Sequence, residues 1–214
     1  MKQLEKQPIL LRLLLVASTL TLLAACDRQA PEKKFLIGFS QCTTGDAWRQ
    51  TMLEDMKREL AFHPDLELIV EDAANSSEVQ VEQIRELAVR DIDLLIVSPN
   101  EAEPVTPVVE EVFSKGIPVV LVDRKTSSDL YTAYTGGDNR GIGETAATFA
   151  ANLCGGKCKV LEIWGLRGST PAMQRHEGFA EAMKKYPGME IVGEVNGRWE
   201  GEFVAKDFPA VLQQ

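Results

Sequence analysis

The chain has 214 residues, of which 44% are hydrophobic and 26% carry a charge. These shares are ordinary for a globular protein, and the length suffices for one large or two small domains. The formal net charge is −9, and no basic cluster occurs beyond the N-terminus, which argues against a nucleic acid partner.

Residues 1–26 are predicted to be an export signal. Three basic residues within the first twelve positions precede an apolar run at 13–23, which is short for a membrane span. Leucine and two alanines then precede Cys26, as in a bacterial lipobox, where cleavage leaves the cysteine sulfur to be lipidated. A plain signal peptide or an uncleaved anchor is the alternative. Each places the mature chain in the periplasm, and residues 27–34 are predicted to be a polar tether.

An alternation of β-rich runs with helical periodicity begins at residue 35. The runs at 94–97 and 118–122 are unbroken and apolar, as expected for strands covered on both faces. Right-handed crossovers turn such a chain into an α/β fold, an open parallel sheet with helices on both faces. Strands are predicted at 35–40, 66–70, 94–97 and 118–122. Three helices are predicted between them: one at 46–62, one that begins at Asn75, and one that ends near Lys115.

Local signals mark where these helices begin. Asn75 to Glu78 reads as a capping box, in which Asn75 accepts from the amide three residues on and Glu78 reaches back. Pro104 and Pro107 are predicted to lie in the first turn of the next helix, where proline is tolerated.

A short strand at 131–137 is predicted to lead into a second α/β unit, 138–214, after a first lobe at 35–137. Asp138 or Asn139 caps a helix through Leu153, and Thr170 caps the next, followed by proline. Two strands are too few to bury a complete sheet, so this second lobe is predicted to be truncated. The remaining predicted elements of this lobe are strands at 159–164 and 191–195 and a helix at 203–212. The helix through Leu153 is predicted to have an apolar face formed by Ile142, Ala146, Phe149, Ala150 and Leu153.

Three cysteines follow Cys26. Cys154 and Cys158 are spaced so that a tight loop could close them into a disulfide, and two free thiols are the alternative. Cys42 is predicted to be a buried small hydrophobe. With only two histidines in the chain, we predict no metal site, and no cofactor motif is present.

Candidate ligand-binding residues follow the predicted strands, because parallel sheets bind ligands beyond the carboxyl ends of their strands. Carboxylates accept hydroxyl protons, guanidinium groups donate in a fork, and an indole covers the apolar face of a sugar ring. The set therefore suits a small polyol, most readily a monosaccharide. The candidates are Asp46, Trp48, Arg49, Asp123, Arg124 and Arg175.

Each candidate also has a purely structural interpretation. Asp123 and Arg124 could form a surface ion pair, and Asp46 could simply cap its helix. Trp48 could be a buried helix residue, while Arg49 and Arg175 could face solvent. A carbohydrate-acting enzyme with Asp123 and Asp46 as its carboxylates is a further alternative, although the sequence lacks the common catalytic motifs.

Several motifs, in order, resemble the ribose- and galactose-type periplasmic sugar-binding proteins. The motifs are Gly38-Phe39-Ser40, Ile96-Val97-Ser98-Pro99-Asn100, Gly116-Ile117-Pro118-Val119 leading to Asp123-Arg124, Gly137-Asp138-Asn139, and Arg175-His176-Glu177-Gly178-Phe179. The segment from Ser40 to Arg49 is most similar to the sensor domains of Bacteroides-type hybrid two-component regulators. Arg49 stands where ribose-type members carry a second aromatic residue, which puts ribose itself in doubt.

The resemblance implies a two-lobed protein that closes on a sugar. Asp123, Arg124 and Arg175 would bind hydroxyls and the ring oxygen, Trp48 would stack on the ring, and Asn139 would line the cleft near the hinge. The implied partner is a histidine kinase module or an ABC transporter permease, with the membrane reached through the lipid anchor. A sugar-responsive DNA-binding repressor would need a DNA-binding segment before the sheet, where residues 1–34 are instead predicted to be an export signal and a tether.

Overall fold

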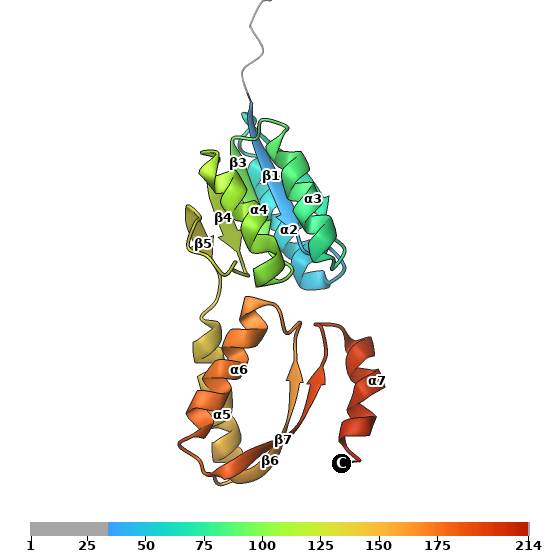
Figure 1. The fold of residues 1–214 in the computed structure, drawn as a ribbon, viewed down its shortest axis with the longest axis vertical. Coiled ribbons are helices and arrows are strands. Elements are labelled where there is room, and N and C mark those ends of the chain that lie inside the picture. Colours follow the sequence, from blue (N-terminus) through green and yellow to red (C-terminus); the bar gives the residue numbers. More distant parts are fainter. Residues whose placement is uncertain (1–33, 214) are drawn as a thin grey trace, which may run out of the picture. The chain divides into compact units, whose positions relative to one another are not determined.

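A five-stranded parallel sheet forms the first part of the computed structural model, which describes residues 34–213 (Figure 1). The predicted export signal, Cys26 and all but the last tether residue lie outside these residues. The strand order is β2-β1-β3-β4-β5, and every pairing is parallel, which confirms the predicted open sheet. The strands are β1 (Phe35–Gln41), β2 (Leu66–Asp72), β3 (Leu94–Ser98), β4 (Val119–Val122) and β5 (Ala133–Thr135).

Helices cover both faces of this sheet, with α3 (Ser77–Ala88) and α4 (Ala102–Ser114) in front of it and α2 (Ala47–Leu60) behind it in Figure 1. The main core cluster joins buried residues of α3, β3, α4 and β4, and all of its buried members are valine, leucine or isoleucine. Such residues suit a strand or helix packed on all sides, so burial holds these elements in place.

The first turns of α3 and α4 differ from the sequence prediction. Ser76 caps α3, and its hydroxyl accepts from the amide of Val79 at 3.3 Å. Asn75 has a φ of 64°, a left-handed conformation, whereas a capping residue needs an extended backbone. The predicted capping box is therefore wrong by one residue. Pro107 lies inside α4 rather than in its first turn.

The second sheet has two parallel strands, β6 (Lys157–Trp164) and β7 (Gly188–Asn196). It is accompanied by α5 (Asn139–Leu153), α6 (Thr170–Met183) and α7 (Gly201–Val211), so this part has the two strands and three helices that the sequence predicted. The cap of α6 is Ser169 rather than the predicted Thr170.

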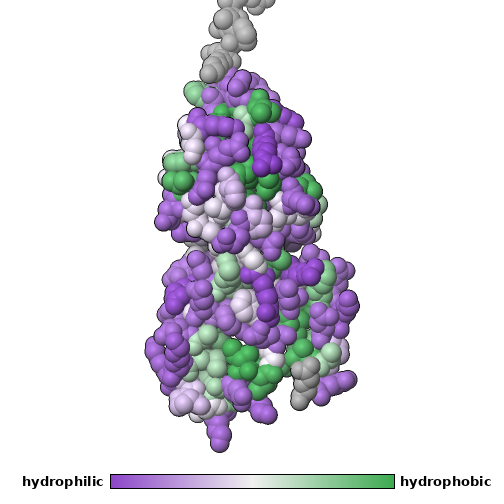
Figure 2. Space-filling model, in the orientation of Figure 1, coloured by the Kyte–Doolittle hydropathy of each residue, from purple (hydrophilic) through white to green (hydrophobic). Residues whose placement is uncertain are grey.

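Helices α5 and α6 pack closely through small residues. A Cβ added at Gly143 would overlap the carbonyl oxygen of Arg175, and one at Gly178 would overlap that of Arg140. Gly143, Ala147 and Ala151 are the buried positions near the middle and end of α5. The predicted apolar face of α5 is instead largely exposed, with Phe149 at 69%. Figure 2 shows further hydrophobic surface over the β6 and β7 region.

The structure joins Cys154 to Cys158 by a disulfide that closes the turn between α5 and β6. Cys42 is a free thiol and fully buried. Burial raises the pKa of this thiol, which keeps it neutral. Within residues 34–213, no helix is both long and apolar enough to span a membrane.

Candidate functional site

The carboxyl ends of β1, β3 and β4 lie side by side, because these three strands are consecutive in the sheet. Two of these strands are followed by predicted site residues. Asp46 and Arg49 come after β1, and Asp123 and Arg124 come directly after β4. The parallel topology thereby brings residues from distant parts of the chain to one sheet edge.

Arg49 is the centre of this group and is only 4% exposed. Its Nη1 donates to Ser98 Oγ at 2.9 Å and its Nη2 to Asp123 Oδ2 at 2.8 Å. Its Nε lies 3.5 Å from Asp46 Oδ2, while Asp46 Oδ1 accepts from the Arg49 amide and so caps α2. The solvent-facing interpretation of Arg49 is therefore wrong, and the capping interpretation of Asp46 is correct as one of its two roles.

Asp123 has a strained backbone, with a φ of 64°. Its amide donates to Thr135 O at 2.8 Å, and the hydroxyl of Tyr134 donates to its carbonyl at 3.1 Å. These two bonds from β5 hold the backbone in a conformation that a non-glycine residue rarely adopts. The carboxylate is 25% exposed and is thus available to a ligand.

Arg124 is 4% exposed and is anchored to backbone carbonyls. Its Nη1 donates to Asn100 O at 2.7 Å and to Pro99 O at 3.4 Å, and its Nε lies 3.7 Å from Asp123 Oδ2. Burial lowers the pKa of the Arg124 guanidinium from its ordinary value. Two buried guanidinium groups thus face one carboxylate, a donor-rich arrangement.

Trp48 is 58% exposed, so its interpretation as a buried helix residue is wrong. The Cζ of Arg49 lies 5.5 Å from the centre of the Trp48 ring, which places one indole near the buried guanidinium. The ring offers an accessible apolar surface beside the polar group.

The helices beside the second sheet contribute Arg175, from α6, and Asn139, from the start of α5. Arg175 Nε donates to Asn139 Oδ1 at 2.9 Å, and Asn139 Nδ2 donates to Gly137 O at 3.2 Å. The Cζ of Arg175 lies 5.6 Å from the ring centre of Trp199. Trp199 is 43% exposed and follows β7. Sequence reasoning missed this residue, although extending the search past the last strand would have found it.

Loops at the carboxyl ends of the two sheets contact one another. The Ala102 amide donates to Gly168 O at 2.9 Å, and Asn75 Nδ2 donates to Glu200 Oε1 at 3.1 Å. The hydroxyl of Thr170 accepts from the Lys125 amide at 2.8 Å. Three separate connections therefore join the carboxyl-end loops of one sheet to those of the other.

Gln41 is a second residue that was not among the predicted binding residues. It ends β1, is fully buried, and neither atom of its side-chain amide has a hydrogen-bond partner among the described residues. Buried amides are normally satisfied, so an unpaired one at this sheet edge needs an explanation. The strand predicted at 35–40 stopped one residue short, so the sequence did not indicate that Gln41 is a buried strand residue.

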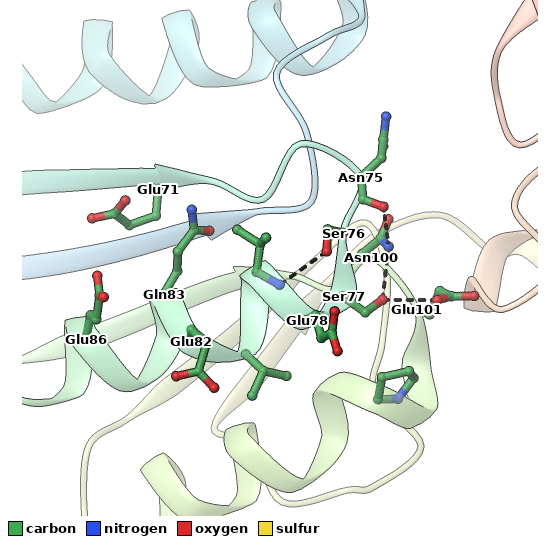
Figure 3. Close-up of a pocket in the computed structure, with 13 residues that line it drawn as sticks. Glu71, Asn75, Ser76, Ser77, Glu78, Glu82, Gln83, Glu86, Asn100 and Glu101 are labelled. Carbon is green, nitrogen blue, oxygen red and sulfur yellow. Dashed lines mark hydrogen bonds between the residues drawn. The ribbon is translucent and has the colours of Figure 1, made fainter.

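A cavity of about 1160 Å³ lies along α3, apart from the predicted binding residues (Figure 3). Its lining is rich in glutamates, including Glu78, Glu82 and Glu86, and contains none of the predicted binding residues. At one end Asn100 Nδ2 donates to Asn75 O at 3.2 Å and to Ser77 Oγ at 3.0 Å. Among residues 34–213, no cluster of three or more His, Cys, Asp or Glu side chains is arranged to hold a metal ion.

A parallel α/β sheet followed by a second one, with polar and aromatic side chains at their carboxyl ends, defines a class of small-molecule binding proteins. The family model for the periplasmic binding protein domain matches residues 37–214. The chain belongs to this family, and membership implies an extracytoplasmic location.

Two sugar-binding proteins and one solved sugar-binding domain are similar to this chain. The ribose import binding protein of Bacillus subtilis is 29% identical over 75% of this chain and 56% of that protein. The galactofuranose-binding protein of Escherichia coli is 29% identical over 92% of this chain and 63% of that protein. The fructose-binding periplasmic domain of a hybrid two-component system superposes with a TM-score of 0.81 and 40% identity. That structure is matched over 84% of this chain and 59% of its own length.

Proposed function

We propose that the chain binds a monosaccharide between two lobes, residues 35–137 and 138–214. The observation that carries the proposal is the group Arg49, Asp123 and Arg124. Here two buried guanidinium groups hold one partly exposed carboxylate at the sheet edge. A carboxylate fixed in this way accepts from two neighbouring hydroxyls, while the remaining guanidinium donors meet sugar oxygens.

The aromatic residues support a sugar rather than a small ion. Trp48 follows β1 and Trp199 follows β7, so an exposed indole stands near each polar group. Indole rings cover the C–H faces of pyranose and furanose rings. Asp123, Arg49, Arg124 and Arg175 then supply the polar contacts, with Asp46 and Asn139 orienting Arg49 and Arg175.

Fructose is the first ligand to test, because a relative at 40% identity is a fructose-binding domain. The same relative belongs to a hybrid two-component system, which favours a role as sensor input to a histidine kinase. A solute receptor of an ABC transporter is the alternative partner context, supported by the ribose import relative. In both roles, lipidation of Cys26 would tether the protein to the membrane.

An enzymatic role for Asp46 and Asp123 receives less support. Both carboxylates contact the same guanidinium, with Arg49 Nη2 at 2.8 Å from Asp123 and Nε at 3.5 Å from Asp46. A glycosidase pair needs room for the scissile bond between its two carboxyl groups, and here Arg49 occupies that space.

Thermal unfolding of the full-length protein with fructose, ribose and galactose tests the proposal. A ligand at a hundred times its Kd should stabilise the fold by about 2.7 kcal/mol. Product analysis after long incubation is the matching control. No stabilisation by any of a broad panel of monosaccharides would contradict sugar binding, and turnover of the sugar would contradict a binding-only role.

A further inference from the structure

Gln80 is a fully buried polar residue on α3, away from every predicted binding residue in sequence. It shares the buried face of the helix with Ile84 and Leu87. An apolar side chain would pack at this position without any need for partners. The hydrogen-bond partners of the Gln80 side-chain amide therefore explain why a polar residue is buried here.

The two ends of the Gln80 amide bind the segment that follows β3. Its Nε2 donates to Ser98 O at 3.0 Å, and its Oε1 accepts from the Asn100 amide at 2.7 Å. Nε2 also lies 3.3 Å from Ser40 Oγ at the end of β1. One side chain thus ties together the ends of two adjacent strands and the turn between β3 and α4.

The same two residues hold the buried arginines of the site. Ser98 Oγ accepts from Arg49, and Asn100 O accepts from Arg124. Gln80 therefore contacts the two residues that anchor these guanidinium groups, through different atoms of each. A shift of the segment 98–100 would move both anchors together.

We propose that Gln80 is a positioning residue for the binding site, one that fixes Arg49 and Arg124 through Ser98 and Asn100. This inference rests on the proposed sugar-binding function. It identifies Gln80, on α3, as a residue that sets the geometry of the guanidinium donors without belonging to the binding edge itself. Donors held in place before binding lower the cost of ordering them around a ligand.

The test compares Gln80→Met with Ile84→Val in the full-length protein. Gln80→Met keeps side-chain length and removes both hydrogen-bonding ends, whereas Ile84→Val perturbs the same helix face without touching Ser98 or Asn100. We expect Gln80→Met to weaken sugar affinity by about fivefold to tenfold. Ile84→Val should lower the melting temperature and leave affinity within about twofold.

A double substitution shows whether Gln80 acts through the arginines. In an Arg124→Lys background, the change in log Kd for sugar that Gln80→Met causes should be about half or less of the change it causes in the parent protein, because the effects of coupled residues are not additive. Full additivity, or an affinity of Gln80→Met within about twofold of the parent, would overturn the proposal. If Gln80→Met does not fold, Gln80→Asn replaces it, since the shorter amide cannot reach both strands.

A second readout needs no sugar. The Nε–Hε NMR signals of Arg49 and Arg124 should shift or broaden in Gln80→Met and stay unchanged in Ile84→Val. Unchanged arginine signals in Gln80→Met refute the positioning role by themselves. If the parent protein binds no sugar, the proposed function fails, and these signals still decide whether Gln80 positions the arginines.

Discussion

Arg49 and Asp123 are 74 residues apart in the sequence, yet Nη2 of the arginine donates to Oδ2 of the aspartate at 2.8 Å. The bond links the first turn of α2 to the residue after β4, across the ends of β1 and β3. Arg49 is almost fully buried, while the Asp123 side chain keeps 25% of its surface exposed. The pair therefore has a fixed inner partner and an accessible outer one.

Asp123→Ala should abolish the thermal stabilisation that sugar gives to the full-length protein. The substitution removes the exposed acceptor and leaves two buried guanidinium groups without their shared carboxylate. Differential scanning fluorimetry with and without sugar measures the effect. Asp55→Ala on the exposed face of α2 is the matched control and should keep the full ligand-induced shift. An unchanged shift in Asp123→Ala would show that the carboxylate has no part in binding.

Arg49→Met should destabilise the ligand-free fold by about 2 kcal/mol, because Ser98 Oγ loses its donor and Asp123 keeps only the longer contact with Arg124. This expected loss of stability is smaller than that for a fully buried ion pair, because solvent reaches Asp123. Urea unfolding provides the measurement. Arg58→Met removes an exposed ion pair with Asp55 on the same helix and should change the unfolding free energy by about 0.5 kcal/mol or less. Equal losses in the two variants would contradict a special role for Arg49.

The sheet was predictable because its central strands are short, unbroken apolar runs, and the residues directly after such strands lie at the binding edge. The burial of Arg49 was not predictable, because helical spacing does not say where a long side chain ends. Trp199 was missed for a different reason. The search for polar and aromatic residues after the strands stopped before the segment that follows β7, where Trp199 lies.

Gly143→Ala should destabilise the protein by about 1–3 kcal/mol, because the new methyl group would overlap the backbone of α6 at Arg175. The same change should weaken sugar binding, since α6 carries the Arg175 guanidinium. Gly201→Ala is the control, because a Cβ there meets no atom within 4 Å. Chemical unfolding and sugar titration of both variants provide the comparison. A Gly143→Ala protein as stable as Gly201→Ala would rule out close packing of α5 on α6.

The close packing of α5 on α6 also explains why the sequence predicted the wrong buried face for α5. Hydropathy ranks Phe149 and Ile142 above glycine and alanine, so the sequence pattern favoured the wrong face. Two helices whose backbones approach closely need small residues at the contact, and large apolar residues are then left elsewhere on the surface.

Tyr134→Phe should make stability less sensitive to alkaline pH. Burial, and next the charge of Asp123, raise the pKa of the Tyr134 hydroxyl above its ordinary value of about 10. The folded state favours the neutral phenol, so this contribution is complete below about pH 10 and is lost as pH rises through the folded-state pKa. Urea unfolding at pH 8 and pH 11 should show a larger loss for the parent than for Tyr134→Phe. Since all other groups are common to both proteins, a pH-independent difference between them would contradict the prediction.

The bonds between the two sheets' loops have a consequence for folding kinetics. Thr170 accepts from Lys125 across 45 residues, and Asn75 donates to Glu200 across 125. Closing loops of this length costs chain entropy, and contacts of large sequence separation slow folding. The strands β1 to β4 can pair with their neighbours before residues 157–196 are ordered. The loops that meet at the proposed site are therefore completed last, and early refolding intermediates should have a formed first sheet without sugar affinity.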